Sequence, residues 1–194
     1  MSNVQVSSEK VLFHIDELKN MGLSNYKINK LVNEGNLTKL SKSYYENENY
    51  IGDENDFYYV KAYSKDGVVC LLSAAVYYGL SNYMPKDVEV AVRSNVRVST
   101  KPEWPPMKFY YFNEKRHTLG IEEVRVGENS FKIYDIEKTV IDIVSLRNKI
   151  GVGEVQEVLK NYLSMRTRDI NKLISYSSEL RCYEILTKYL EVLL

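Results

Sequence analysis

The sequence predicts an α+β protein in which an N-terminal winged helix-turn-helix, the head (residues 1–55), is followed by a larger mixed α/β domain, the body (residues 56–194). Two short helical patterns separated by three or four residues precede a β-prone stretch, which is the order of a winged helix-turn-helix. A run of acidic residues then marks a domain boundary. Strand patterns follow, and the final third of the chain is helical.

The first helix of the head is expected to begin at a cap on Ser7 or Ser8 and to end at Met21-Gly22. Its apolar residues recur at helical spacing: Val11, Leu12, Ile15 and Leu18.

The second helix of the head is expected to run from a cap on Ser24 or Asn25 to Asn33, with Gly35 ending it. Its apolar side comprises Ile28, Leu31 and Val32.

A short hairpin strand is expected after the second helix, because residues 37–45 alternate in character and end in the β-prone pair Tyr44-Tyr45. The next stretch, from Glu46 to Asp56, contains five acidic residues, no basic residue and one glycine. This composition favours a linker, so the boundary is placed after residue 55.

The first part of the body is expected to contain helices over 57–64 and 68–78 and strands over 87–93 and 107–112. A hairpin over 122–126 and 131–134 is expected around Gly127.

Four helices are expected to complete the body: 136–148, 152–165, 169–180, and 182 to the end. The first has Asp135 as its N-cap, and Arg147 falls inside its apolar stripe, where an ion pair or a carbonyl cap is favoured over a functional role. Lys138 and Asp142, four residues apart, are interpreted as an ordinary surface ion pair.

The amino-acid composition limits the classes of function that we expect for this chain. Two Cys and two His, isolated in the sequence, favour neither a disulfide framework nor a metal site, and no motif for a cofactor or catalytic centre is present. No secretion signal is visible and the longest apolar run, 68–80, is shorter than the roughly 20 residues that span a bilayer, so we expect a cytoplasmic protein. Equal numbers of basic and acidic residues, 26 each, predict modest nonspecific affinity for DNA.

The charge is nevertheless uneven: Lys19 to Tyr45 contains five Lys and one Glu, a local net charge of +4. A helical wheel centred on Ile28 places polar and basic side chains on the opposite face of the second helix, where they could contact bases and phosphates, although any amphipathic helix has a solvated face. The candidate DNA-binding residues are Lys19, Ser24, Asn25, Tyr26, Lys27, Asn29, Lys30, Asn33, Lys39 and Lys42.

Four strings, in this order, carry a family resemblance: LVNEGNLTKLSKSYY (31–45), GVVCLLSAAVYYGL (67–80), KIYDIEKTVID (132–142) and RNKIG (147–151). Their order and spacing resemble the AbiEi antitoxins of type IV toxin–antitoxin systems, which act in phage abortive infection. The resemblance implies a winged helix-turn-helix repressor, two copies of which bind an inverted repeat in their own promoter. It also implies an antitoxin that counteracts a nucleotidyltransferase toxin without a stable complex. The chain departs from the family in the wing, where Lys42-Ser43 replaces a basic residue followed by glycine.

Two alternative functions belong to classes other than a DNA-binding repressor. The Tyr-rich, charge-balanced body is compatible with an antitoxin that sequesters its partner directly and does not bind DNA. An enzyme is not expected, because the chain lacks the Gly-Ser pair and the Asp-x-Asp metal motif of nucleotidyltransferases.

Overall fold

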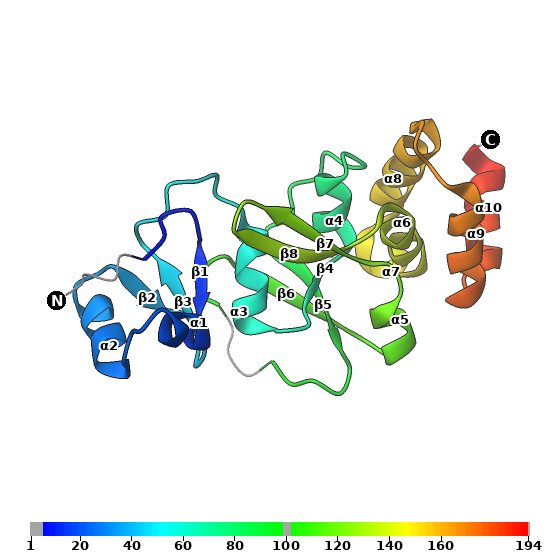
Figure 1. The fold of residues 1–194 in the computed structure, drawn as a ribbon. Helices are drawn as coiled ribbons and strands as arrows, with labels where there is room; N and C mark the ends of the chain where they lie inside the picture. Colours follow the sequence, from blue (N-terminus) through cyan, green and yellow to red (C-terminus); the bar gives the residue numbers. More distant parts are fainter. Residues whose placement is uncertain (1–5, 99–101, 194) are drawn as a thin grey trace.

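The computed structural model describes residues 6–98 and 102–193, with the head at one end of the molecule and the C-terminal helices at the other (Figure 1). The head comprises β1 (Leu12–His14), α1 (Ile15–Asn20), α2 (Asn25–Asn33), β2 (Leu37–Lys39) and β3 (Tyr44–Asn47). Its strands form an antiparallel sheet in the order β1-β3-β2.

The body is built on a five-stranded mixed sheet in the order β6-β5-β4-β8-β7, in which the pairs β5/β6 and β4/β8 are parallel. Its first elements are η1 (Asp56–Tyr59), α3 (Val60–Tyr63), β4 (Val68–Val69), α4 (Leu71–Tyr77), β5 (Val88–Arg93), β6 (Met107–Phe112), α5 (Glu114–Thr118), β7 (Ile121–Val126) and β8 (Asn129–Tyr134). The helical third comprises α6 (Ile136–Ser145), α7 (Arg147–Ile150), α8 (Val152–Ser164), α9 (Ile170–Glu179) and α10 (Tyr183–Leu193). The predicted α+β class is confirmed.

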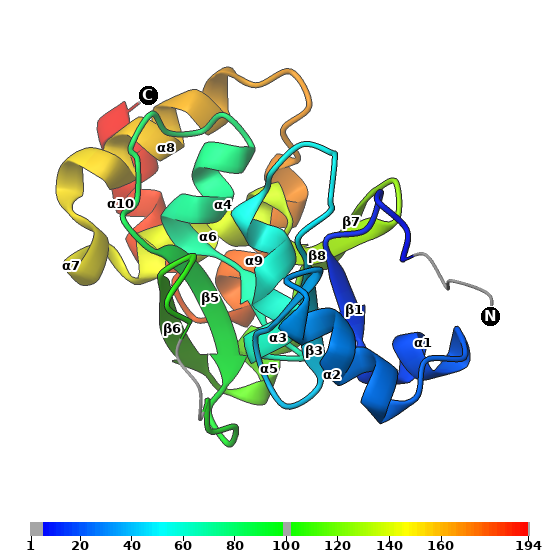
Figure 2. The same cartoon turned by 90° about the vertical axis from the view of Figure 1, so that its left-hand side faces the viewer.

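The five-stranded sheet separates two apolar clusters, because side chains alternate between its faces. Ala91 on β5 and Tyr134 on β8 belong to the cluster that α4, α6 and the C-terminal helices cover, whereas Val90 and Ile133 belong to the cluster that η1, α3 and β1 cover. Figure 2 shows α4 and the C-terminal helices gathered together, away from the head.

The start of the first predicted helix is wrong, because Leu12 to His14 form strand β1 and α1 begins only at Ile15. Three successive residues here are buried on two sides: Val11 and Leu12 pack with the body, and Phe13 packs in the head core. A strand between two cores can bury successive side chains in this way. The cap of α1 is therefore His14, not Ser7 or Ser8, and its ring accepts a hydrogen bond from Asp16 N while Glu17 accepts one from His14 N.

The head and body are joined by more than the acidic segment. Asn129 of β8 is almost fully buried; its Oδ1 accepts a hydrogen bond from Val11 N at 2.8 Å and its Nδ2 donates to Glu9 O at 2.9 Å. The acidic segment itself begins within β3, where the Glu46 carboxylate accepts a hydrogen bond from the Tyr59 hydroxyl.

Three other elements of the body differ from their predictions. Val68 and Val69 form the central strand β4, so the apolar helix begins at Leu71, because a short apolar run fits a buried strand as well as a helix. Helix α5 was not expected, since its five residues are too few for a helical pattern; Asn113 caps it. The predicted helix 136–148 ends at Ser145, and the half-buried Arg147 starts α7 and so lies outside the apolar stripe of α6.

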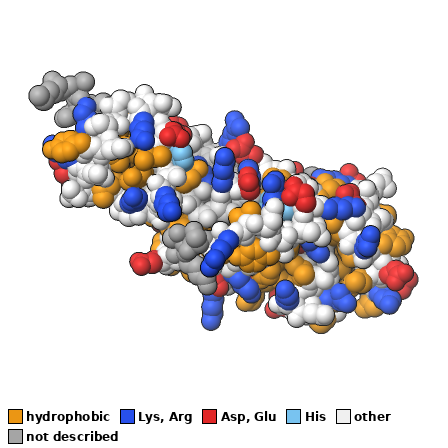
Figure 3. Space-filling model, turned by 90° about the horizontal axis from the view of Figure 1, so that it is seen from below, with side chains coloured by type: hydrophobic (Ala, Val, Ile, Leu, Met, Phe, Trp, Pro, Cys, Tyr) orange, Lys and Arg blue, Asp and Glu red, His pale blue; other side chains and the backbone are white. Residues whose placement is uncertain are grey.

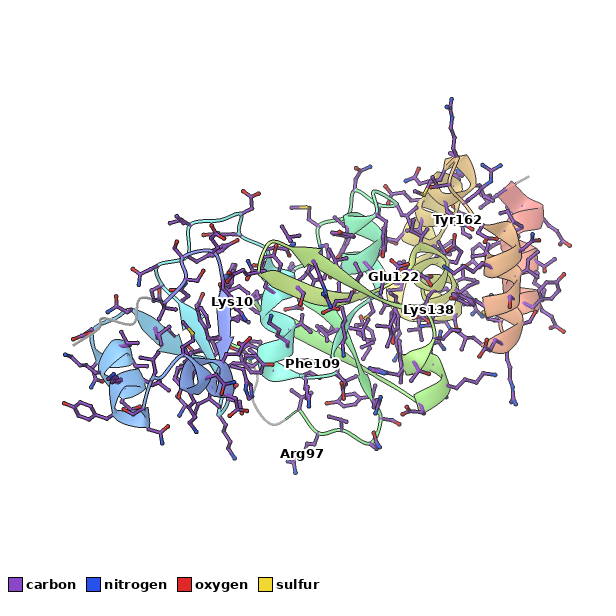
Figure 4. The ribbon with its side chains drawn as sticks, viewed as in Figure 1. Lys10, Arg97, Phe109, Glu122, Lys138 and Tyr162 are labelled. Atoms are coloured by element: carbon purple, nitrogen blue, oxygen red, sulfur yellow. The ribbon has the colours of Figure 1, made fainter. Side chains whose placement is uncertain are left out.

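Lys138 and Asp142 form a buried ion pair, so the prediction of a surface pair is wrong: both side chains are 0 % exposed. Arg116 Nε donates a second hydrogen bond to Asp142 at 2.9 Å, and Lys138 Nζ lies 3.7 Å from the centroid of the Tyr134 ring. Helix α6 is packed against α4, α8, α9 and α10, and its polar face meets Arg116 of α5 and Tyr134 of β8 instead of water. Figure 4 labels Lys138 in this interior.

Candidate nucleic-acid interface

The local fold of the head brings α1 and α2 together through a tight turn. Gly22, with φ +84°, allows the turn, and Leu23 is buried behind it. Ser24 caps α2 by accepting a hydrogen bond from Lys27 N, so of the two predicted caps Ser24 is the one used. Gly35, with φ +73°, lies just beyond the end of the helix.

The inner face of α2 fixes its position in the head. Ile28 is 1 % exposed and packs with Leu18, Leu37 and Tyr45. Leu31 and Val32, the other residues of the predicted apolar side, pack against the same core.

The outer face of α2 and its surroundings carry the ten predicted residues, and the structure places all ten side chains on the surface. Tyr26 is 79 % exposed, which is high for a tyrosine, and it does not belong to the head core. The residues fall into three places: Lys19 at the end of α1, Ser24 to Asn33 on α2, and Lys39 and Lys42 on the β2–β3 ribbon. Their contact with DNA stays a prediction.

Most of the predicted lysines on this surface have no carboxylate neighbour among the described residues. Within the described part of the chain, no carboxylate lies within 4.0 Å of the ammonium groups of Lys19, Lys27, Lys39 or Lys42. Lys30 alone among the predicted lysines has an acidic neighbour, Glu34, at 3.6 Å, and both side chains are exposed. Such a pair is weak in water, so Lys30 can exchange it for a phosphate or a base.

The turn of the β2–β3 ribbon is held by its own side chains. Ser41 Oγ accepts hydrogen bonds from Ser43 N at 3.4 Å and from Tyr44 N at 3.3 Å. The Tyr44 ring makes an edge contact with the His14 ring, with 5.0 Å between centroids. The exposed Lys42 thus lies at the tip of a hydrogen-bonded turn, although this turn has Ser43 where the family pattern has glycine.

Two lysines that the sequence did not indicate face the same turn from the body. Lys61 lies on α3 and Lys65 follows it, and both line the cleft that Lys42 and Ser43 also line. No sequence signal could identify them, because their proximity to the ribbon depends on how the head packs on the body.

The geometry gives less support to a metal site, a reactive cysteine or a membrane-spanning helix. Among the described residues, no three His, Cys, Asp or Glu side chains are grouped so that they could hold a metal ion. Burial raises the pKa of the Cys70 thiol well above its usual value, and the nearby Glu89 carboxylate raises it further, which disfavours the nucleophilic thiolate. None of the helices in residues 6–98 and 102–193 is both long and apolar enough to cross a membrane.

The sequence was also compared with known proteins. No family model matches the chain, and no curated protein matches it significantly. The resemblance to AbiEi antitoxins therefore rests on the four strings named above.

Proposed function

We propose that this chain binds double-stranded DNA through α2 and acts as the antitoxin and autorepressor of a type IV toxin–antitoxin operon. The observation that carries the DNA-binding part is the exposed outer face of α2, which presents amide, phenol and ammonium groups opposite a buried apolar inner face. Among the described residues, Lys30 alone of the predicted lysines has a carboxylate neighbour, in the exposed pair with Glu34. In this proposal the head is a winged helix-turn-helix, with α1 and α2 as its helices and the β2–β3 ribbon as its wing.

The proposed roles follow from the chemistry of DNA. Tyr26, Asn29 and Lys30 would lie nearest the bases, because Asn can bind adenine in two places and Lys can reach guanine. Phosphates would be held by Lys19, Lys27, Lys39 and Lys42. Two copies on an inverted repeat would double the contact area that one small head offers.

The antitoxin part of the proposal rests on the family resemblance. It implies a cytoplasmic protein that represses its own promoter and counteracts a nucleotidyltransferase toxin without forming a stable complex with it. The head would supply the repression and the body the antitoxin activity, with the boundary near residue 55.

The test is binding to a duplex taken from the region upstream of the protein's own gene, measured by fluorescence anisotropy over a range of salt concentrations. Four phosphate contacts per copy predict a slope of log affinity against log salt of about −3.6 per copy. Lys27→Ala with Lys30→Ala should lower affinity by about 10- to 100-fold. The matched control removes two exposed lysines at the far end of the body, Lys160→Ala with Lys188→Ala, and should change affinity little.

A third variant separates base contacts from phosphate contacts. Asn29→Ala should reduce the preference for the upstream duplex over a scrambled duplex by about 1–3 kcal/mol and leave the salt slope unchanged. Equal affinity of the wild type and the Lys27→Ala, Lys30→Ala variant for the upstream duplex would refute the assignment of α2.

A second candidate function is direct sequestration of a partner protein, and one surface of the body favours it. A cavity of about 360 Å3 is lined by Phe57, Met84, Pro85 and Trp104, and the side chains of Met84 and Trp104 are 82 % and 68 % exposed. Met and Trp are enriched in protein interfaces. A stoichiometric complex with the toxin that Trp104→Ala disrupts, together with no binding of the upstream duplex, would favour this function over repression.

A further inference from the structure

A cleft of about 550 Å3 lies between the head and the body. One wall is the turn of the β2–β3 ribbon, the other is α3 with Lys65, and His14 at the start of α1 also lines it. The volume falls in the range of ligand-binding sites, and the cleft opens to solvent.

Apart from Ala62, the side chains lining this cleft are cationic or can donate hydrogen bonds. Lys42 approaches from the head, Lys61 and Lys65 approach from the body, and no carboxylate lines the cleft. Within the described residues none of these three ammonium groups has a carboxylate within 4.0 Å. Hydroxyl groups of Ser43 and Tyr63 add neutral donors.

Lys61 is the most enclosed of the three lysines. Burial lowers the pKa of its ammonium group, and the like charge of Lys10 lowers it further, whereas the carboxylates of Glu17 and Glu123 only partly oppose these effects. The Glu17 carboxylate is itself occupied by Lys10 Nζ and by the backbone N–H of His14, at 2.5 and 2.8 Å. The cleft therefore has positive charge that the protein does not neutralise, and an anion placed there would stabilise the charged form of Lys61.

His14 also lines the cleft, and one of its two ring nitrogens has partners within the head. Its Nδ1 accepts a hydrogen bond from Asp16 N and lies 3.3 Å from the Asp16 carboxylate. Lys42, Lys61 and Lys65 are the cationic side chains of the cleft that have no carboxylate within 4.0 Å among the described residues, so the anion is assigned to them.

We propose that this cleft binds a phosphate group of the DNA that α2 contacts, so that Lys61 and Lys65 of the body complete an interface begun by the head. The inference rests on the proposed DNA-binding function and extends it to the body. A DNA phosphate is favoured over a free anion because Lys42 of the ribbon tip lines the cleft and Lys39 lies on the adjoining strand. The proposed function assigns both lysines to the phosphate backbone. Seen from below, basic side chains lie over both the head and the body (Figure 3).

The test compares the wild type with Lys61→Ala plus Lys65→Ala in anisotropy titrations of the upstream duplex. One additional phosphate contact predicts a wild-type salt slope of about −4.5 per copy, and the variant should return it to about −3.6. Affinity at about 0.1 M salt should fall about tenfold, equally for the upstream and scrambled duplexes. Because neither lysine is in an ion pair with a described residue, the thermal unfolding midpoint should change little, with only the packing of the partly buried Lys61 stem lost. Lys160→Ala with Lys188→Ala again controls for lost charge.

The outcomes separate this inference from the proposed function. If the cleft variant binds like the wild type while Lys27→Ala with Lys30→Ala loses affinity, the cleft inference is overturned and the function stands. If the wild type binds neither duplex at low salt, both fail. Inorganic pyrophosphate, titrated calorimetrically, covers the other source of phosphate: if Lys61 and Lys65 are needed for pyrophosphate binding but not for duplex binding, the occupant is a free anion and the DNA assignment is overturned.

Discussion

Replacing Asp142 with Asn should be one of the most destabilising single changes in the body. Asp142 accepts hydrogen bonds from Lys138 and Arg116, and its side chain and that of Lys138 are both 0 % exposed. The neutral amide keeps the shape of the carboxylate but leaves the ammonium group of Lys138 buried without a counter-charge. Breaking one partner of such a pair costs about 3–5 kcal/mol.

The acid–base chemistry of Lys138 sets an upper limit to this cost. A buried lysine without a partner can lose its proton, and removing it at pH 7 from a group whose usual pKa is 10.5 costs at most about 4.8 kcal/mol. Burial already lowers the pKa of Lys138 in the wild type, although Asp142 opposes the shift. A loss of 3–5 kcal/mol corresponds to a fall in Tm of about 6–20 °C for a chain of this size.

The sign of the pH dependence makes the prediction specific. If Lys138 is neutral in the folded variant and protonated in the unfolded chain, the unfolded state binds one more proton, and the stability of the variant rises with pH. Between pH 7 and pH 9 this rise is about 2.7 kcal/mol, and it ends near pH 10.5, the usual lysine value. The wild type should change less, because Asp142 stabilises the protonated lysine.

Urea unfolding followed by far-UV circular dichroism at pH 7 and pH 9 measures both effects. The double variant Lys138→Met with Asp142→Leu provides the matched control, since an apolar pair of similar volume should cost within about 2 kcal/mol of zero. Arg116 keeps 18 % of its side chain exposed, so it can turn toward water in both variants. A cost below 1 kcal/mol for Asp142→Asn, or a double variant as unstable as the single one, would refute the reasoning.

Two other variants test the head and its attachment to the body. Glu17→Gln should cost about 1 kcal/mol at pH 7, as loss of a helix cap does; burial raises the pKa of Glu17, but the bonds from Lys10 and His14 N outweigh it and hold the pKa below 4.5. The stabilisation by the Glu17 carboxylate is present above pH 4.5 and is lost as the pH falls through the lower pKa of the folded state. The urea midpoints of the wild type and of Glu17→Gln should therefore converge in acid. A constant difference between the two midpoints down to pH 2 would contradict this reasoning. Asn129→Ala should cost about 2 kcal/mol, because it leaves the Val11 N–H buried and unpaired, and hydrogen exchange should accelerate in β1 but not in α8.

Local signals were sufficient for much of the fold. The alternation in residues 87–93 predicted β5 to within one residue, and the order Ser24, apolar stripe, Gly35 predicted α2, because caps and periodicity act within one element. Strand β1 was missed because the successive residues Val11, Leu12 and Phe13 are buried in two different cores, the first two in the body cluster and the third in the head core. Periodicity assumes one buried side, and that assumption fails where a segment lies between two cores.

Only part of the candidate site, likewise, could be predicted from the sequence. The exposed face of α2 could be predicted, since the wheel that buries Ile28 also turns Asn29 and Lys30 outward. The same reasoning failed for α6, where the face opposite Val140 and Ile143 meets α5 and β8 side chains, so that Lys138 is buried against Tyr134 and Asp142 is reached by Arg116. A wheel gives the relative directions of side chains but not what surrounds the helix.

The attachment of the head to the body has a consequence for the proposed DNA binding. β1 pairs with β3 of the head while Val11 and Leu12 pack in a body cluster, and Asn129 ties the backbone before β1 to β8. The spacing between α2 and the cleft lysines is therefore fixed before DNA is met, so the second set of contacts requires little further ordering of the chain. If both sets bind one duplex, Asn129→Ala should weaken DNA binding although Asn129 is 3 % exposed and cannot reach DNA. Combining it with Lys61→Ala and Lys65→Ala should then add little, because the loosened body has already lost the contact that these lysines make.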